Sequence, residues 1–237
     1  MRIVAVADTH LYHRELRVPD GDVFVHAGDL CQSGHVRELA IALDWIAELP
    51  HRHKVVIAGN HDWAFVRDRP AALCLVAKGV DYLEDQVLEI GGVRFWGSPW
   101  QPEFCSWAFN LPRGQALAEK WARMPENLDV LVTHSPPSGI GDLTATARRE
   151  GCADLLARVA EVKPRLHLFG HMHESRVTTL AEGGAGARRA WQGCSLFGIE
   201  TLESKDGRES KIDRRHGYAV GQLTLGGPTA SVRLWPR

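Results

Sequence analysis

The chain has 237 residues, of which 44% are hydrophobic and 24% charged, a composition typical of a globular domain. Its formal net charge is −1 at pH 7, so it has no basic surplus, and we do not expect long DNA or RNA as a partner. No apolar stretch reaches membrane-spanning length, and we expect no membrane insertion. The length predicts a single domain over residues 1–237.

The five cysteines are odd in number, scattered, and without a C-x-x-C pair. This pattern argues against a disulfide framework or a zinc knuckle and favours reduced thiols. We therefore expect a cytoplasmic protein.

Apolar runs and helical periodicity alternate along the first 170 residues. They predict strands at 2–7, 23–27, 54–58, 87–90, 93–96, 129–133 and 166–169, and helices at 36–49, 71–78, 115–124 and 152–162. Gly91-Gly92 predicts a hairpin, and residues 218–225 and 230–234 predict a second, closing hairpin. The stretch 200–216 is charged and poor in apolar residues, which predicts a mobile loop. The whole pattern indicates an α/β fold with two packed mixed sheets flanked by helices.

Five of these strands end in side chains that bind metal ions well. In chain order they deliver Asp8 and His10, then Asp29, then Asn60 and His61, then His134, then His171 and His173. Parallel strands place such residues at one edge of a sheet, so we expect a metal site there. Carboxylate, amide and imidazole donors without a thiolate suit Mn, Fe or Zn, and do not choose among them. The donors outnumber what one catalytic ion needs, which indicates two ions roughly 3.5–4 Å apart sharing Asp29. Such a pair can activate a bridging water, so hydrolysis of a phosphate ester follows.

Five motifs occur in a fixed order: D-x-H at 8–10, G-D at 28–29, G-N-H-D at 59–62, T-H at 133–134 and G-H-x-H at 170–173. Together they resemble the calcineurin-like metallophosphoesterase superfamily. The stretches GSPWQPEFCSWAFNLPRG (97–114), THSPP (133–137) and GC-x-x-LL (151–156) also resemble the metallophosphoesterase-domain-containing proteins of animals and their bacterial relatives. That group is similar to class III cyclic nucleotide phosphodiesterases.

The resemblance implies a fold, a metal centre and an activity. It implies a four-layer αββα sandwich, one ion held by Asp8, His10, Asp29 and His173, and another held by Asn60, His134 and His171 with Asp29 shared. His61 matches the position that steadies or protonates the leaving oxygen. The expected activity is hydrolysis of phosphodiester bonds in a small substrate, such as a cyclic nucleotide, by a metal-bridging hydroxide, with Mn expected ahead of Fe or Zn. A metal-dependent nuclease and a non-catalytic scaffold are the alternatives.

Two features leave questions open. Residues 28–34 lack the Asp and Arg of the G-D-x-x-D-R-G motif in Ser/Thr protein phosphatases of the superfamily, so the residue that orients His61 is unassigned and a phosphoprotein substrate is disfavoured. The loop 98–114 carries Trp100, Phe104, Trp107 and Phe109 among prolines. These rings form a satellite core or line the mouth of the site, with Trp100 and Trp107 the best candidates to stack a base.

The remaining histidines have ordinary interpretations. His26 and His167 lie inside predicted strands and are expected to be core residues. Solvated side chains are expected for His13, His35, His51, His53 and His216.

Overall fold

The computed structural model describes residues 1–76, 79–144 and 146–173, together with the strand segments 195–198, 201–202, 217–218, 221–225 and 230–234. The loop predicted at 200–216 lies outside the described residues apart from 201–202, and His216 is also outside them. Among the described residues, no helix combines the length and the apolarity needed to cross a membrane.

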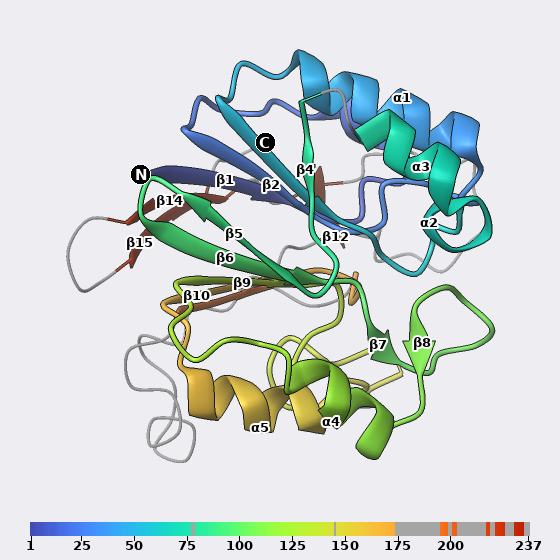
Figure 1. Ribbon diagram of the computed structural model, residues 1–237, viewed down its shortest axis with the longest axis vertical. Helices are drawn as coiled ribbons and strands as arrows, with labels where there is room; N and C mark the ends of the chain where they lie inside the picture. The colour runs from blue at the N-terminus through green and yellow to red at the C-terminus, as the bar shows by residue number, and fades with distance from the viewer. Residues whose placement is uncertain are drawn as a thin grey trace.

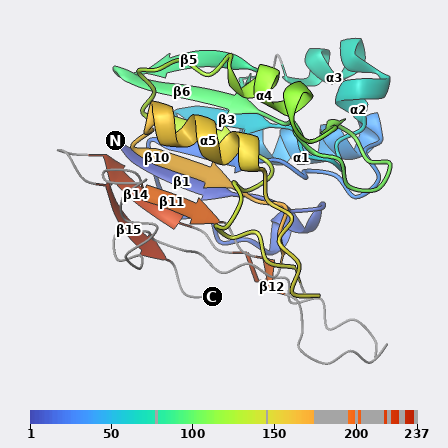
Figure 2. The ribbon, with the colours of Figure 1, turned by 90° about the horizontal axis from the view of Figure 1, so that it is seen from below.

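The described elements form four layers, as predicted (Figure 1). Helices α1 (Val36–Glu48), α2 (Ala64–Arg67) and α3 (Arg69–Val76) cover the outer face of the first sheet. Helices α4 (Gln115–Trp121) and α5 (Ala153–Val162) cover the outer face of the second sheet, which Figure 2 shows from that side. The two sheets pack face to face between these helical layers.

The first sheet has the strand order β15-β14-β1-β2-β3-β4. Strands β1 (Arg2–Val6), β2 (Val23–Ala27), β3 (His53–Ile57) and β4 (Asp81–Tyr82) are parallel. β14 (Gly221–Leu225) pairs antiparallel with both β1 and β15 (Ala230–Leu234). The predicted closing hairpin is therefore confirmed, and its first strand extends the sheet beyond β1.

The second sheet has the order β11-β10-β9-β6-β5. β5 (Gln86–Ile90) and β6 (Val93–Ser98) form the predicted hairpin across Gly91-Gly92, while β9 (Val130–Thr133), β10 (Leu166–Phe169) and β11 (Ser195–Gly198) continue the sheet in parallel. Two small pairs lie outside the sheets, β7 (Gln101–Pro102) with β8 (Asn110–Leu111), and β12 (Thr201–Leu202) with β13 (Gly217–Tyr218). A short 3-10 helix spans Tyr12–Glu15.

Most predicted elements lie within a few residues of their expected bounds, and the differences have local causes. The helix expected at 115–124 ends as α4 at Trp121. The helix expected from Cys152 begins at Ala153, because Cys152 is the N-cap of α5 and its Sγ accepts a hydrogen bond from the Leu155 amide at 3.3 Å. The four-residue helix α2 and the two-residue strand β4 were not predicted, because such short elements carry no periodic signal.

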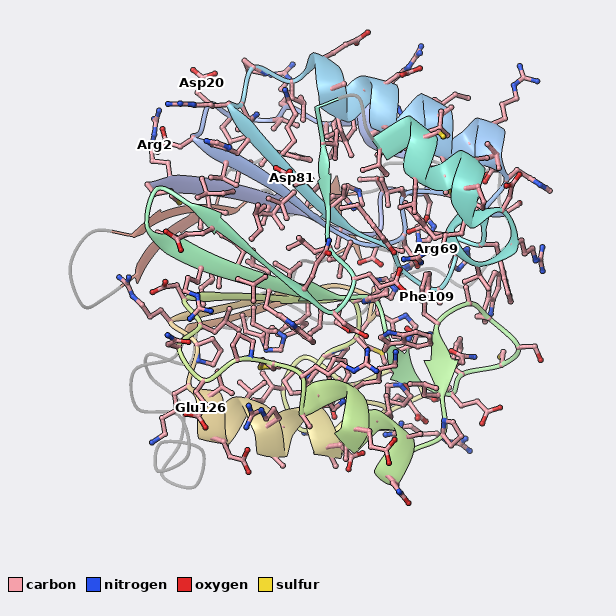
Figure 3. The ribbon with its side chains drawn as sticks, in the orientation of Figure 1. Arg2, Asp20, Arg69, Asp81, Phe109 and Glu126 are labelled. Carbon is pink, nitrogen blue, oxygen red and sulfur yellow. The ribbon has the colours of Figure 1, made fainter. Side chains whose placement is uncertain are left out.

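The core explains why the polar residues sit at strand ends. On β1, Ile3 and Ala5 pack against the second sheet, whereas Val4 and Val6 pack against the helical layer. The strand is thus buried on both faces, which accounts for its uninterrupted apolar run. Figure 3 shows side chains filling the space between the two sheets. Polar side chains can therefore reach a shared space only beyond the strand ends.

Candidate metal centre

The residues predicted to bind metal converge at the carboxyl ends of β1, β2, β3, β9 and β10. Three groups of side chains place one candidate ligand atom each within 4.8 Å of one another. The groups are Asp8 with His10 and His173, His10 with Asp29 and His61, and Asp29 with His134 and His171. Asp29 and His10 belong to two groups each, so the three groups form one continuous site.

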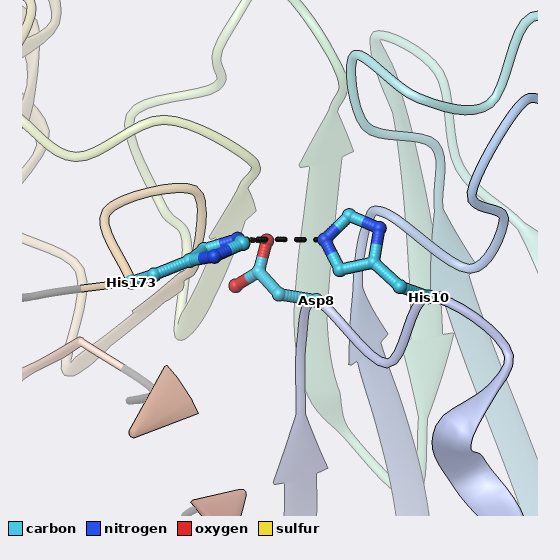
Figure 4. Close-up of side chains that lie close together, drawn as sticks. All are labelled: Asp8, His10 and His173. Carbon is cyan, nitrogen blue, oxygen red and sulfur yellow. Dashed lines mark hydrogen bonds and ion pairs between the residues drawn. The ribbon is translucent and has the colours of Figure 1, made fainter. Parts of the chain in front are cut away.

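The first group joins Asp8 and His10, which belong to the first motif, to His173, which belongs to the last (Figure 4). His10 Nε2 lies 3.4 Å from His173 Nε2, and His173 Nε2 lies 3.8 Å from Asp8 Oδ1. His10 Nδ1 donates to the Cys31 carbonyl at 2.9 Å, because a carbonyl oxygen can only accept. In the neutral imidazole this leaves the lone pair of His10 Nε2 facing His173, an arrangement that a shared cation would stabilise.

The third group contains His134, which is fully buried. Its Nδ1 donates to the Ala27 carbonyl at 3.0 Å, and its Nε2 lies 2.9 Å from Asn60 Oδ1 and 3.4 Å from Asp29 Oδ1. Burial lowers the pKa of His134, but the Asp29 and Asp8 carboxylates outweigh burial and raise that pKa to about 9. The carboxylates therefore favour a positive charge at this place. The donor set and this field fit a divalent metal ion.

The backbone around the candidate ligands is strained. Asp8, His10, Asp29 and His171 all have positive φ, at 53°, 41°, 57° and 73°. Non-glycine residues adopt this left-handed region at a cost of roughly 1–2 kcal/mol each, and such strain gathers at functional sites. Hydrogen bonds hold it in place: the His171 amide donates to both Asp8 carboxylate oxygens, at 3.1 and 3.0 Å.

The glycines of the motifs are required by close approach. A Cβ on Gly28 would meet His134 Nδ1, and Gly28 also has a φ of 96°. A Cβ on Gly59 would overlap the Asp29 carboxylate. Side chains at either position would push candidate ligands apart, so the G-D and G-N-H patterns have a steric basis.

His61 is held at three points. Its backbone amide donates to Asp29 Oδ1 at 2.8 Å, its Nδ1 donates to the Gln32 carbonyl at 2.6 Å, and its ring stacks on Trp107 with centroids 4.1 Å apart. The Gln32 carbonyl thus orients His61, answering the question that the missing motif Asp left open. No sequence signal points to it, because any residue type carries that carbonyl. His61 also lies close enough to Asp29 to be a ligand, so its separate role stays a prediction.

Asp62 is a structural residue that the sequence reasoning could not assign. Its fully buried carboxylate accepts the backbone amides of Gly59, Cys31 and Leu30, at 2.8, 2.9 and 3.2 Å. These bonds tie the loop that carries Asp29 to the loop after β3. The last position of G-N-H-D therefore fixes the spacing of two ligand loops.

The rings of loop 98–114, here called the aromatic loop, divide between packing in the core and lining the site. Trp100 packs against the core, donates its Nε1 to Asp85 at 3.2 Å and carries the Lys120 ammonium 3.8 Å from its ring centroid, so the core interpretation applies to it and base stacking does not. Trp107 already stacks on His61. Phe104 is 47% exposed, lies edge-on to His171 and lines the pocket over the site, which makes it the free ring of this loop.

The histidines outside the site follow the expectations in part. His26 and His167 are core residues, each bonded to a threonine hydroxyl, as predicted. The solvated positions expected for His13 and His51 are wrong, because both are buried, at 1% and 2% exposure. His13 stacks on Trp45, and His51 packs on Phe24. Tertiary packing thus covers polar stretches that look exposed in the sequence.

A pocket of about 380 Å³ opens over the candidate ligands. Its floor includes Asp29, Asn60, His171 and His173. Its walls come from His61, Phe104 and the alternating residues Thr144, Thr146, Arg148 and Glu150. The wall segment was not singled out from the sequence, because nothing in its composition indicates which strand ends it faces.

Comparisons with known proteins agree with this geometry. Residues 1–175 match the family described as calcineurin-like phosphoesterase. Metallophosphoesterase domain-containing protein 1 of Homo sapiens is 42% identical over 197 residues, which cover 73% of this chain and 60% of that protein. UPF0046 protein C25E10.12 of Caenorhabditis elegans is 37% identical over 204 residues, covering 77% of this chain and 72% of that protein. This chain thus spans about 60% of the length of the human relative.

Two solved structures share the fold at low sequence identity. TT1561 of Thermus thermophilus superposes with a TM-score of 0.57 at 12% identity, covering 98% of both chains. GAP50 of Plasmodium, described as the anchor in the inner membrane complex, superposes with a TM-score of 0.52 at 11% identity, covering 99% of this chain and 84% of its own. At these identities the likeness concerns the fold alone.

Proposed function

This chain belongs to the calcineurin-like phosphoesterase family, and on that premise we propose that it hydrolyses phosphodiester bonds of a small substrate with two divalent metal ions. The observation that carries the proposal is the convergence of carboxylate, amide and imidazole donors from five strand ends on one site, of which Asp29, Asn60, His171 and His173 line the pocket. A non-catalytic scaffold would be expected to have lost some of these donors, and this sequence keeps all of them.

The proposed ligands divide into two sets that share Asp29. Asp8, His10 and His173 would hold one ion, and Asn60, His134 and His171 would hold the other. When bound, the ions supply Lewis-acid activation of water and neutralise charge on the phosphoryl oxygens. Mn²⁺ is our first choice among ions that suit oxygen and imidazole donors, with Fe and Zn next.

The chain's own contribution to the chemistry centres on His61. Because the Gln32 carbonyl fixes Nδ1 as the protonated nitrogen, Nε2 is the nitrogen available to the substrate. Stacking on Trp107 restricts the tilt of the ring. In the imidazolium form, which carries a proton on Nε2 as well as on Nδ1, His61 is placed to donate the Nε2 proton to the leaving oxygen, and general acid assistance of this kind is typically worth about 10²–10⁴-fold in rate.

The size of the pocket supports a small substrate. Its volume of about 380 Å³ lies near the lower end of the range typical of sites for small molecules and cofactors. The formal net charge of −1 gives no general attraction for long polyanions. We therefore place nucleotides, including cyclic nucleotides, ahead of nucleic acids as substrates. We also propose a cytoplasmic location, supported by the free thiols of Cys31, Cys74, Cys105 and Cys152.

A hydrolysis screen tests the proposal. Metal-depleted protein is loaded with Mn²⁺, Fe²⁺ or Zn²⁺ and assayed against cyclic nucleotides, bis(p-nitrophenyl) phosphate, p-nitrophenyl phosphate and single-stranded DNA. We expect the diesters of low molecular weight to be hydrolysed fastest, with two ions bound per chain. Protein carrying Asp29→Asn, purified in the same way, controls for contaminating phosphatases. Preferential cleavage of DNA would favour a nuclease, and absence of all hydrolysis in the two-metal protein would favour a scaffold.

A further inference from the structure

Part of the pocket wall is a turn formed by residues 142–144 and 146–150, here called the pocket turn. Thr144, Thr146, Arg148 and Glu150 line the pocket, whereas Leu143 and Arg149 do not. This alternation is the pattern of an extended hairpin that presents one face to the site. The pairing of Leu143 with Arg149 as an antiparallel bridge supports that description. The lining face is polar throughout.

Hydrogen bonds hold Arg148 in the turn. Its backbone amide donates to Thr144 Oγ1 at 3.1 Å, and its carbonyl accepts from the Thr144 amide at 2.9 Å. At the base of the turn, the Glu150 amide donates to the Asp142 carbonyl at 3.0 Å. The backbone of Arg148 is therefore fixed beside the pocket, although the residue itself is exposed.

The guanidinium of Arg148 has no hydrogen bond or ion pair with any residue that the structure describes. Neighbouring charges in the wall are already paired: Glu150 accepts from Arg113 Nη2 at 3.2 Å, and Arg149 donates to Asp142 at 2.6 Å. Glu150 therefore has Arg113 as its partner, and the charge of Arg148 is available to a ligand. The G-D motif contributes no arginine, since residues 30–34 are Leu-Cys-Gln-Ser-Gly. Arg148, which lines the pocket, adds an arginine to the site from a different part of the chain.

Phe104 supplies the complementary apolar surface. The amide group of Asn110 donates to the carbonyls of Phe104 and Cys105, both at 3.0 Å, so the backbone that carries the ring is held in place. The ring is 47% exposed and lies 5.8 Å from the His171 ring, at an edge-on angle of 84°. An exposed aromatic ring beside a cluster of polar donors is a recognition surface for a flat group.

We propose that Arg148 and Phe104 are the specificity-determining pair of this pocket, selecting a phosphate ester whose alcohol carries a planar ring. Arg148 binds a non-bridging phosphoryl oxygen in a charge-assisted hydrogen bond, and Phe104 packs against the ring. The proposal rests on the function proposed above, because the reacting phosphoryl group is placed at the candidate metal ligands. It adds to that function the two residues that choose the substrate.

Two probes separate the contributions, because 5′-AMP and ribose 5-phosphate share a sugar phosphate and differ in the ring. Their dissociation constants are measured by calorimetry on Mn²⁺-loaded protein. Loss of a charge-assisted bond predicts that Arg148→Gln weakens both probes by about tenfold or more, with Arg148→Lys in between. Loss of a stacking face predicts that Phe104→Ala weakens 5′-AMP by about tenfold and ribose 5-phosphate by less than about twofold.

Matched controls lie outside the pocket. Arg37→Gln removes an exposed positive charge on α1, and Leu143→Ala removes an exposed apolar side chain, 45% accessible, from the pocket turn. Both should bind the two probes as the unaltered protein does. Unchanged affinities in Arg148→Gln and Phe104→Ala would overturn the specificity pair, even if the protein hydrolyses phosphodiesters. If these two variants lose affinity as expected but the unaltered protein hydrolyses no ester, the specificity pair stands and the proposed function is overturned. A protein that neither binds the probes nor hydrolyses esters would overturn both.

Discussion

Arg149 is a surface residue, but replacing it should lower the free energy of unfolding by more than its exposure suggests. It is 59% exposed in its side chain, but its partner Asp142 is 0% exposed, and their closest atoms are 2.6 Å apart. The second bond to the Asp142 carboxylate comes from the Gly139 amide at 2.7 Å. Replacing Arg149 by Met therefore leaves a buried carboxylate with one fewer donor, whereas replacing Asp142 by Asn removes the charge and keeps an acceptor for Gly139.

The magnitude lies between two limits. Exposed ion pairs contribute about 0–1 kcal/mol, and breaking a buried pair by removing one partner costs about 3–5 kcal/mol. Because only the carboxylate is buried, solvent screens the pair in part, and we expect Arg149→Met to cost about 2 kcal/mol. Asp142→Asn should cost about 1 kcal/mol, the usual net value of one hydrogen bond. The double variant should be no less stable than Arg149→Met alone.

Urea unfolding of the metal-free single and double variants at about pH 8 measures these differences. Asp44→Asn, an exposed change on α1, serves as the control and should lie within about 0.5 kcal/mol of the unaltered protein. The turn also carries Arg148, so Arg149→Met should weaken 5′-AMP binding more than Asp142→Asn does. Equal or smaller destabilisation by Arg149→Met would show that the buried carboxylate does not depend on its arginine, and would refute the reasoning.

Three further predictions concern the metal centre and the core. Asp29→Asn should lose bound metal and nearly all activity, since Asp29 belongs to two ligand groups; two ions per chain by elemental analysis together with full turnover would contradict this. His61→Ala should keep its metal and lose about 10²–10⁴-fold in turnover, less for a nitrophenolate leaving group, and loss of metal would instead make His61 a ligand. Burial lowers the pKa of His13 from 6.5 to about 4, so the unfolded chain binds a proton that the folded chain excludes as pH falls below 6.5. The free energy of unfolding of His13→Phe should therefore rise by about 2 kcal/mol relative to that of the unaltered protein between about pH 8 and about pH 5. A difference in unfolding free energy that does not change with pH would exclude this account.

Much of the fold could be read from local patterns. The strands buried on both faces appear as apolar runs, and the Gly91-Gly92 turn indicates its hairpin, because these signals need only neighbouring residues. The candidate metal ligands could also be proposed from the sequence as a set of residues. A parallel strand must end at the same edge as its neighbours, so Asp, Asn and His residues after successive strands are brought together by the topology itself.

Contacts between distant segments could not be read in the same way. The orientation of His61 comes from the Gln32 carbonyl, which every residue type would offer. The role of each ring in the aromatic loop depends on its contacts. Trp100 donates a hydrogen bond to Asp85 and lies under the Lys120 ammonium, and Trp107 stacks on His61. Phe104 is the ring that remains free to face the pocket. A single sequence does not encode these partners in any local period.

The sequence by itself indicated the four-layer class and the types of donor residue in the candidate site, because strand periodicity and the residue types that follow each strand can be read from short stretches. The tertiary structure alone decided that the turn after Asp142 faces those donors and presents Arg148 to them. The physical reason is that the direction of a loop depends on hydrogen bonds such as that from Arg113 to the Glu150 carboxylate, and on packing across the two sheets. Those forces act between residues far apart in the chain, and they place Arg148 in the wall of the pocket that candidate metal ligands also line.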